Sequence, residues 1–104
     1  MDAKRNDCPI PVWPVSERPR EKLIAVGAGA LTDAELLAVL LRSGAPGISA
    51  LGVARELIGR FGGLRGVLSA DRASLCAVPG LGAGKYALLQ AGLELARRHY
   101  AEPL

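Results

Sequence analysis

The sequence has little of what catalytic and metal-binding sites most often use. Aromatic residues make up 4% of the 104 residues, and there are two cysteines and one histidine. Neither cysteine has a second cysteine or histidine at ligand spacing, so a zinc knuckle, a redox motif and a multi-histidine metal site are excluded. His99 would have to serve alone in a Ser-His-Asp or Cys-His site, and its place at the end of an expected helix favours a cap. We therefore expect no metal, no cofactor and no catalysis by this chain.

Long apolar runs are also absent. The run at residues 36–41 is far shorter than the roughly 18–20 residues that cross a bilayer, and no signal segment opens the chain. We therefore expect a soluble, cytoplasmic protein that makes no membrane contact. Half of the residues are hydrophobic, mostly leucine and alanine, which favours helices over a β-sandwich. The length fits one compact all-α domain and excludes a multi-domain enzyme.

The net positive charge is small, but it is unevenly distributed along the chain. The net charge is +3, with six Lys/Arg and six Asp/Glu in residues 1–54, against seven and four in residues 55–104. The whole positive excess therefore lies in the second half. Since so small a charge is also common in proteins that do not bind nucleic acid, the positions of the charges must decide.

The first 16 residues are expected to differ from the rest. Pro9, Pro11 and Pro14 keep this segment extended, so we predict a flexible Pro-rich arm at 1–16 and a folded domain at 17–102. Trp13 is the exception in the arm. An isolated aromatic beside a domain more often packs back onto it than it recognises a partner, so we expect it to anchor the end of the arm.

Five to six short helices are expected in the domain. Pro19 suits a first helical turn and Gly27 ends that helix, while Thr32 and Glu35 form a capping box for the next one. The apolar residues 36–41 then predict a helix with no solvent face. Further helices are expected at 50–61, capped by Ser49, and in a short apolar segment near 64–68. A second short helix, capped by Ser69 or Asp71, is expected to run through Leu75, Cys76 and Val78, and the last helix is expected at 83–100.

The last expected helix is the longest. Four of its apolar residues are expected to lie on one side: Ala87, Leu88, Ala91 and Leu95. Gly92 in the middle of this helix implies close packing against a neighbour. Cys76, shortly before this helix, is expected to be a small buried apolar residue.

Residues 78–85, Val-Pro-Gly-Leu-Gly-Ala-Gly-Lys, carry the clearest chemical signal. Pro79 stops the preceding helix, Gly80 and Gly82 permit a tight turn, and Leu81 can point inward as a plug. The turn leads into the N-terminus of the last helix. There the N–H groups of Gly82, Ala83 and Gly84 would face outward, without side chains to keep a phosphate away, and Lys85 adds a full charge.

This pattern is typical of a helix-hairpin-helix motif. Seven positions match its usual form: Leu75, Val78, Pro79, Gly80, Leu81, Gly82 and Ala87. The alternative is that the hairpin only joins two helices. Residues 32–61 resemble a diverged first copy with exposed Arg55 and Arg60, but this copy lacks the Gly-apolar-Gly pattern. We therefore expect a pseudo-twofold pair of units in which the first is mainly structural.

Several stretches, in the same order, are similar to the N-terminal region of the bacterial RadC family. They are residues 13–14 (WP), 17–23 (ERPREKL), 31–38 (LTDAELLA), 40–44 (LLRSG) and 79–82 (PGLG). The resemblance covers about 13–102. It implies a compact helical bundle built on helix-hairpin-helix units, of the SAM-like or RuvA domain 2-like class, and a link to DNA repair. It also implies a C-terminal JAB/MPN metalloprotease-like domain with a His-x-His and Asp metal site. That domain is absent here, so we expect this chain to be either a piece of a longer protein, which the ending Glu102-Pro103-Leu104 favours because it resembles the lead-in to that domain, or the product of a gene that lost the domain.

Three functions remain to be compared. The first is a non-catalytic module that holds the backbone of DNA, double-stranded or branched, without reading its sequence. Its expected contacts are Gly80, Leu81, Gly82, Ala83, Gly84, Lys85, Arg72, Arg97 and Arg98. The second, a helix-hairpin-helix glycosylase, is disfavoured because glycine stands where its lysine is needed and no aspartate follows Asp71. The third is a protein-interaction domain that docks the absent C-terminal domain or another partner.

Overall fold

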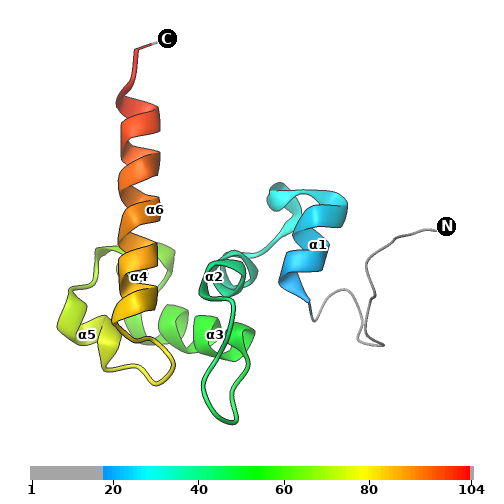
Figure 1. Ribbon diagram of the computed structural model, residues 1–104, viewed down its shortest axis with the longest axis vertical. Coiled ribbons are helices and arrows are strands. Elements are labelled where there is room, and N and C mark those ends of the chain that lie inside the picture. The colour runs from blue at the N-terminus through cyan, green and yellow to red at the C-terminus, as the bar shows by residue number, and fades with distance from the viewer. Residues whose placement is uncertain (1–17, 104) are drawn as a thin grey trace, which may run out of the picture.

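Residues 18–103, the part of the chain that the computed structural model describes, contain helices and no strand. The elements follow in the order α1 (Pro19–Val26), the short 3-10 helix η2 (Ala28–Ala30), α2 (Asp33–Leu41), α3 (Ala50–Phe61), α4 (Leu64–Ser69), α5 (Arg72–Cys76) and α6 (Ala83–Ala101). Figure 1 shows their arrangement. The all-α prediction is confirmed. The arm predicted at 1–16, with Trp13, lies outside the described residues.

The helix starts follow the local signals in the sequence. Thr32 and Glu35 form the expected capping box, in which the Thr32 hydroxyl accepts the Glu35 N–H and the Glu35 carboxylate accepts the Thr32 N–H. Ser49 also caps α3 by accepting the Gly52 N–H, and Asp71 caps α5 by accepting the Ser74 N–H. Because these side chains satisfy N–H groups that have no partner within the helix, each fixes where its helix begins.

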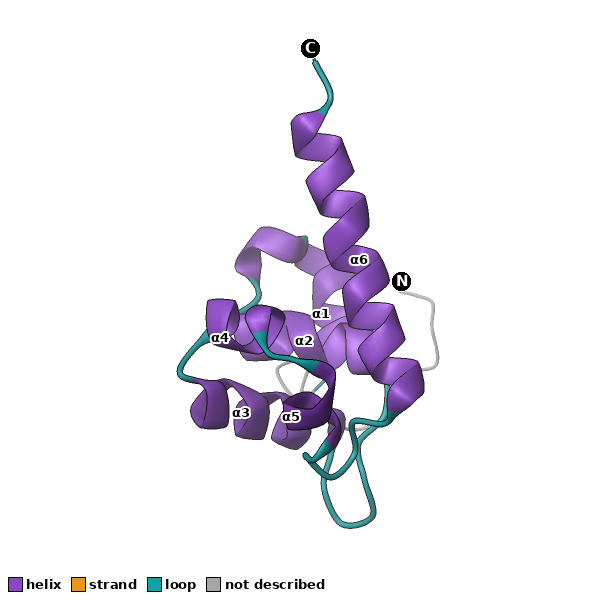
Figure 2. Ribbon diagram, turned by 90° about the vertical axis from the view of Figure 1, so that its left-hand side faces the viewer, coloured by secondary structure: helices purple, strands orange, loops and turns teal. Residues whose placement is uncertain are grey.

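The core lies where α2 and α3 cross, with α4, α5 and the start of α6 packed around them. Leucine and valine fill it because the apolar positions of these helices recur at helical spacing. Its largest fully buried side chains are Leu41, Leu57, Leu75, Leu81, Val53, Val67 and Val78. Figure 2 shows the shorter helices clustered at the base of α6.

Two loops meet at the same end of the molecule, one between α2 and α3 and one between α5 and α6 (Figures 1 and 2). In the first, Ala45 and Ile48 exchange two backbone hydrogen bonds around Pro46 and Gly47. The second loop packs against it. A Cβ atom added to Gly80 would lie 3.0 Å from Val53 Cγ2 and 3.2 Å from the Cβ of Ala45.

The apolar side of α6 does not face the core. Ala87, Leu88, Ala91 and Leu95 are all exposed, Leu95 to 70%, and Leu89 is the residue of α6 that is buried. The reason is visible in Figure 1, where the second half of α6 extends beyond the helices at its base. Gly92 likewise has open space around its Cα within the described residues, so the expected close packing is absent.

Two smaller expectations also need correction. The helix α2 does present a side to solvent, because Leu40 is 45% exposed. Cys76 is half-buried, since α5 ends there at the edge of the core. No helix in the described part of the chain is long and apolar enough to cross a membrane.

Candidate functional site

The α5–α6 turn agrees with the sequence prediction at Gly80 and Leu81 but not at Gly82, whose φ of −87° is open to any residue. Gly80 has a φ of 92°, which residues with a Cβ rarely adopt, and the Leu81 N–H donates to the Val78 carbonyl oxygen at 3.1 Å. Leu81 is 1% exposed, so its role as an inward plug is confirmed. Its side chain therefore cannot touch a ligand, although we named Leu81 among the expected contacts.

The N-terminus of α6 is open to solvent. Gly82 precedes the helix in an extended conformation and no side chain caps it, in contrast to α2, α3 and α5. Gly82, Ala83 and Gly84 are exposed, and a Cβ on Gly82 or Gly84 would meet nothing within 4 Å. The N–H groups of this first turn and the positive end of the helix dipole therefore face a space that an anion can enter.

Lys85 has a structural role that the sequence did not indicate. Its Nζ donates to the Ser43 carbonyl oxygen at 2.5 Å and lies 3.5 Å from the Gly44 carbonyl oxygen. These carbonyls belong to the loop that follows α2, so Lys85 holds that loop against the start of α6. An ammonium group has three N–H donors, and one is left for a ligand.

The structure does not bring the other predicted arginines to the hairpin. Arg97 and Arg98 lie three turns further along α6, about 18 Å from Lys85 at the helical rise, and both pair with Glu94. Their hydrogen bonds lower the pKa of Glu94 to about 2 and raise that of Arg97. Arg72 is exposed at the first residue of α5, whose other end leads into the hairpin.

A basic groove of about 1220 Å³ lies beside the hairpin instead. Its cationic lining comes from four elements and their flanking residues: Arg18, Arg20, Arg42, Arg55 and Lys85. The groove also includes Gly84, at the open start of α6, and one carboxylate, that of Glu21. Apart from Lys85, sequence reasoning named none of these cations as contacts. Because they are far apart in the chain, no linear pattern connects them.

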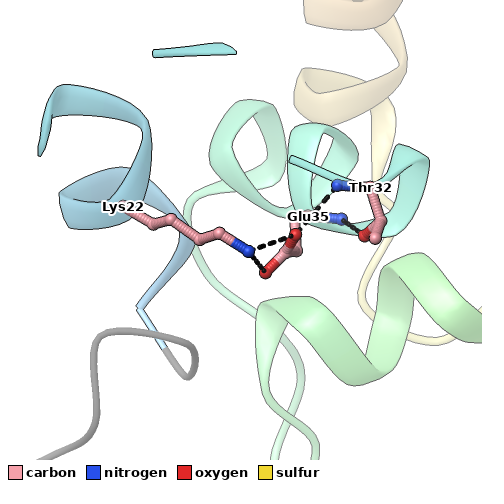
Figure 3. A network of polar contacts seen from close by, with 3 residues as sticks. All are labelled: Lys22, Thr32 and Glu35. Carbon is pink, nitrogen blue, oxygen red and sulfur yellow. Dashed lines mark hydrogen bonds and ion pairs between the residues drawn. The ribbon is translucent and has the colours of Figure 1, made fainter. Parts of the chain in front are cut away.

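An ion pair joins α1 and α2, the helices from which Arg20 and Leu40 line the groove; Figure 3 shows this pair. Lys22 Nζ lies 3.2 Å from both carboxylate oxygens of Glu35, the same carboxylate that closes the α2 capping box. These bonds keep α1, with Arg18 and Arg20 at its start, against α2. They also lower the pKa of Glu35, mainly through the Thr32 N–H and then through Lys22.

This contact predicts that acid detaches α1. Because the pKa of Glu35 is lower in the folded chain than its ordinary 4.5, its stabilising effect is complete above that value and is lost as the pH falls through the folded pKa. Hydrogen exchange at stepwise lower pH should show α1 losing protection before α3 does. Lys22→Met should produce the same loss at neutral pH. If α1 stays protected in that variant, the ion pair does not hold it.

The residues of the site offer no metal centre. Between residues 18 and 103, no three His, Cys, Asp or Glu side chains come together in a way that could hold a metal ion. The arrangement can bind an anion through backbone N–H groups and cationic side chains.

Comparison with known proteins shows the family. The family described as UPF0758 N-terminal matches residues 10–87. The UPF0758 protein of Thioalkalivibrio sulfidiphilus is 58% identical over 96 residues, which are 92% of this chain and 43% of that protein. The relative from Chromohalobacter salexigens is 62% identical over 87 residues, 84% of this chain and 39% of its own length. The relative from Aeromonas hydrophila is 54% identical over 95 residues, which are 91% of this chain and 42% of that protein.

No solved structure matches this chain, so the likeness to the SAM-like and RuvA domain 2-like class stays a prediction. The chain spans about two fifths of the length of these relatives. The matched region is the N-terminal part of the family. With a family match over three quarters of its residues and relatives at 54–62% identity, the chain belongs to the UPF0758 family, in the N-terminal domain.

Proposed function

We propose that this domain is a non-catalytic module that binds the phosphate backbone of DNA, double-stranded or branched, without sequence specificity. In this proposal residues 75–87 are a helix-hairpin-helix motif, and the domain is the N-terminal part of a RadC-like protein associated with DNA repair. The observation that carries the proposal is the uncapped, side-chain-free start of α6, which opens beside a groove lined by Arg42, Arg55 and Lys85.

The chemistry of these groups fits a phosphodiester. Backbone N–H groups at a helix start donate to phosphate oxygens, and the lysine and arginines beside them neutralise its charge. Neither kind of contact carries information about the bases, so binding independent of sequence follows. The expected affinity is micromolar or weaker at physiological salt, on the order of other non-specific contacts.

A salt titration with an arbitrary duplex tests this proposal. With about two to four phosphate contacts, log affinity should fall against log salt with a slope of roughly −2 to −4, and a scrambled duplex should give the same line. Gly82→Val should weaken binding at least several-fold, because its side chain would occupy the space in front of the N–H groups.

Gly92→Val is the matched control, because Gly92 lies on the same helix, also with open space, but away from the hairpin. Both variants must keep the helical content of the parent. A folded Gly82→Val protein that binds the duplex as well as the Gly92→Val protein does would show that the start of α6 is not a phosphate site.

The exposed face of α6 favours a second function, docking of another protein region. Leu95 and Tyr100 are 70% and 84% exposed, on the half of α6 that projects from the other helices. The relatives have more than half of their length outside the matched region, so this face would dock the C-terminal domain. Leu95→Asp would then increase the protease sensitivity of the link between the two parts in a full-length relative.

A further inference from the structure

We infer that the basic groove is a second phosphate-binding site, in which Arg42 and Arg55 hold the same nucleic-acid backbone that meets the start of α6. This inference rests on the proposed function and extends it from one hairpin to both. It also gives the α2–α3 unit, which the sequence predicts to be mainly structural, a direct part in binding.

Arg42 occupies a backbone conformation that is costly for arginine. Its φ is 69° and its ψ is −40°, and the Ser43 N–H donates to the Leu41 carbonyl oxygen across it at 2.7 Å. This i to i+2 hydrogen bond with a positive φ is the rare, strained form of the γ-turn. Within residues 18–103, Arg42 is the non-glycine residue with positive φ, although glycine would adopt this turn without the penalty.

The charges of Arg42 and Arg55 are available to a ligand. Both side chains are exposed and line the basic groove, and neither has an ion-pair partner in the described part of the chain. By contrast, Arg60 pairs with Glu56 on the same helix as Arg55. Strained residues collect at functional sites, and here the strained residue carries an uncompensated charge into a groove.

The groove and the start of α6 form one continuous surface. Gly84 and Lys85 belong to both, and Lys85 binds the carbonyls of Ser43 and Gly44, directly after Arg42 in the chain. A backbone that touches the N–H groups of α6 therefore has Arg42 and Arg55 beside it. Arg42, Arg55 and the remaining donor of Lys85 complement a polyanion and select phosphodiester as the occupant, whereas Arg20 pairs with Glu21 and Arg18 is only 6% exposed.

Salt titrations of duplex binding by the 104-residue chain test the inference. Arg42→Gly and Arg55→Gln should each reduce the magnitude of the salt slope by about one, and Arg42→Lys should keep it. Arg65→Gln is the matched control, because Arg65 is exposed on α4 and does not line the groove. Arg42→Gly relieves the strained turn, so a melting temperature no lower than that of the parent will show that weaker binding is not due to unfolding.

The pattern of results separates this inference from the proposed function. If Gly82→Val weakens binding while Arg42→Gly and Arg55→Gln match the Arg65→Gln control, the groove inference is overturned and the hairpin proposal stands. If the arginine variants weaken binding and Gly82→Val does not, the groove is the site and the hairpin proposal falls. No duplex binding by the unchanged chain at low salt overturns both.

The apolar floor of the groove provides a test for a different occupant, an acidic amphipathic peptide. Leu40 and Leu88 are exposed to 45% and 38% and line the groove. A phosphodiester backbone does not need these apolar side chains, whereas an acidic amphipathic helix would bury them. If the chain instead binds an acidic amphipathic helical peptide, loses that binding in Leu40→Ser, and shows no effect of Arg42→Gly on duplex binding, the phosphate inference is wrong.

Discussion

Replacing Leu81 with alanine is expected to lower the free energy of unfolding by about 2–5 kcal/mol. Leu81 is 1% exposed and belongs to the same core cluster as Leu75 and Val53, so the smaller side chain leaves a cavity beneath the α5–α6 hairpin. A domain of this size has a total stability of about 5–15 kcal/mol, so the loss takes a large share of it. Chemical denaturation followed by helical circular dichroism measures the change.

Leu95→Ala is the matched control for that experiment. Leu95 lies on the exposed half of α6 at 70% exposure, so the same substitution should change the free energy of unfolding by less than about 0.5 kcal/mol. Equal losses at the two positions would mean that Leu81 is not a core residue. If Leu95→Ala is the more harmful of the two, the projecting half of α6 is packed in solution.

The starts and ends of the helices could be predicted because their causes are local. The capping box of Thr32 and Glu35 and the caps at Ser49 and Asp71 each act within three residues. Gly62 ends α3 in the left-handed conformation with a φ of 79°. A sequence contains all of the information that such contacts require, so these boundaries appear where they were expected.

The buried side of α6 could not be predicted in the same way. Ala87, Leu88, Ala91 and Leu95 have helical spacing, which identifies an apolar side but does not supply a partner for it. Tertiary packing instead places Leu89 and Tyr86 against the core. The apolar side that periodicity identified is therefore an exposed surface, and it becomes a candidate for contact with the remainder of a longer chain.

The hairpin of the candidate site could be predicted from the sequence, but the arginines beside it could not. The hairpin is one contiguous motif, so its turn and its inward leucine could be predicted from eight residues. Arg97 and Arg98 were expected nearby because they are basic residues on the same helix, but the rise of α6 carries them away and Glu94 pairs with them. Arg42 and Arg55 approach Lys85 only because α2 and α3 fold back beside α6. No local rule contains that information.

Replacing each of the two hairpin glycines with valine should lower stability by different amounts. Gly80→Val is expected to cost at least about 1–3 kcal/mol in backbone strain, because its φ is 92°, and more from the contacts with Val53 and Ala45. Gly82→Val should cost no more than about 1 kcal/mol, the effect of a poorer N-cap, because its φ is −87° and its surroundings are open. Thermal melts of both variants measure this difference.

Duplex binding gives these glycines their second comparison. At a temperature where both variants are folded, Gly82→Val should bind poorly with parent-like stability, since only the approach to the N–H groups is blocked. Gly80→Val should lose stability. If its altered turn still keeps the start of α6 in place, its duplex binding should be reduced only in proportion to the fraction of protein that is unfolded. A Gly80→Val protein as stable as the parent would contradict the left-handed turn, since valine adopts that conformation only with strain. The pair therefore separates the glycine that the fold requires from the glycine that the proposed phosphate contact requires.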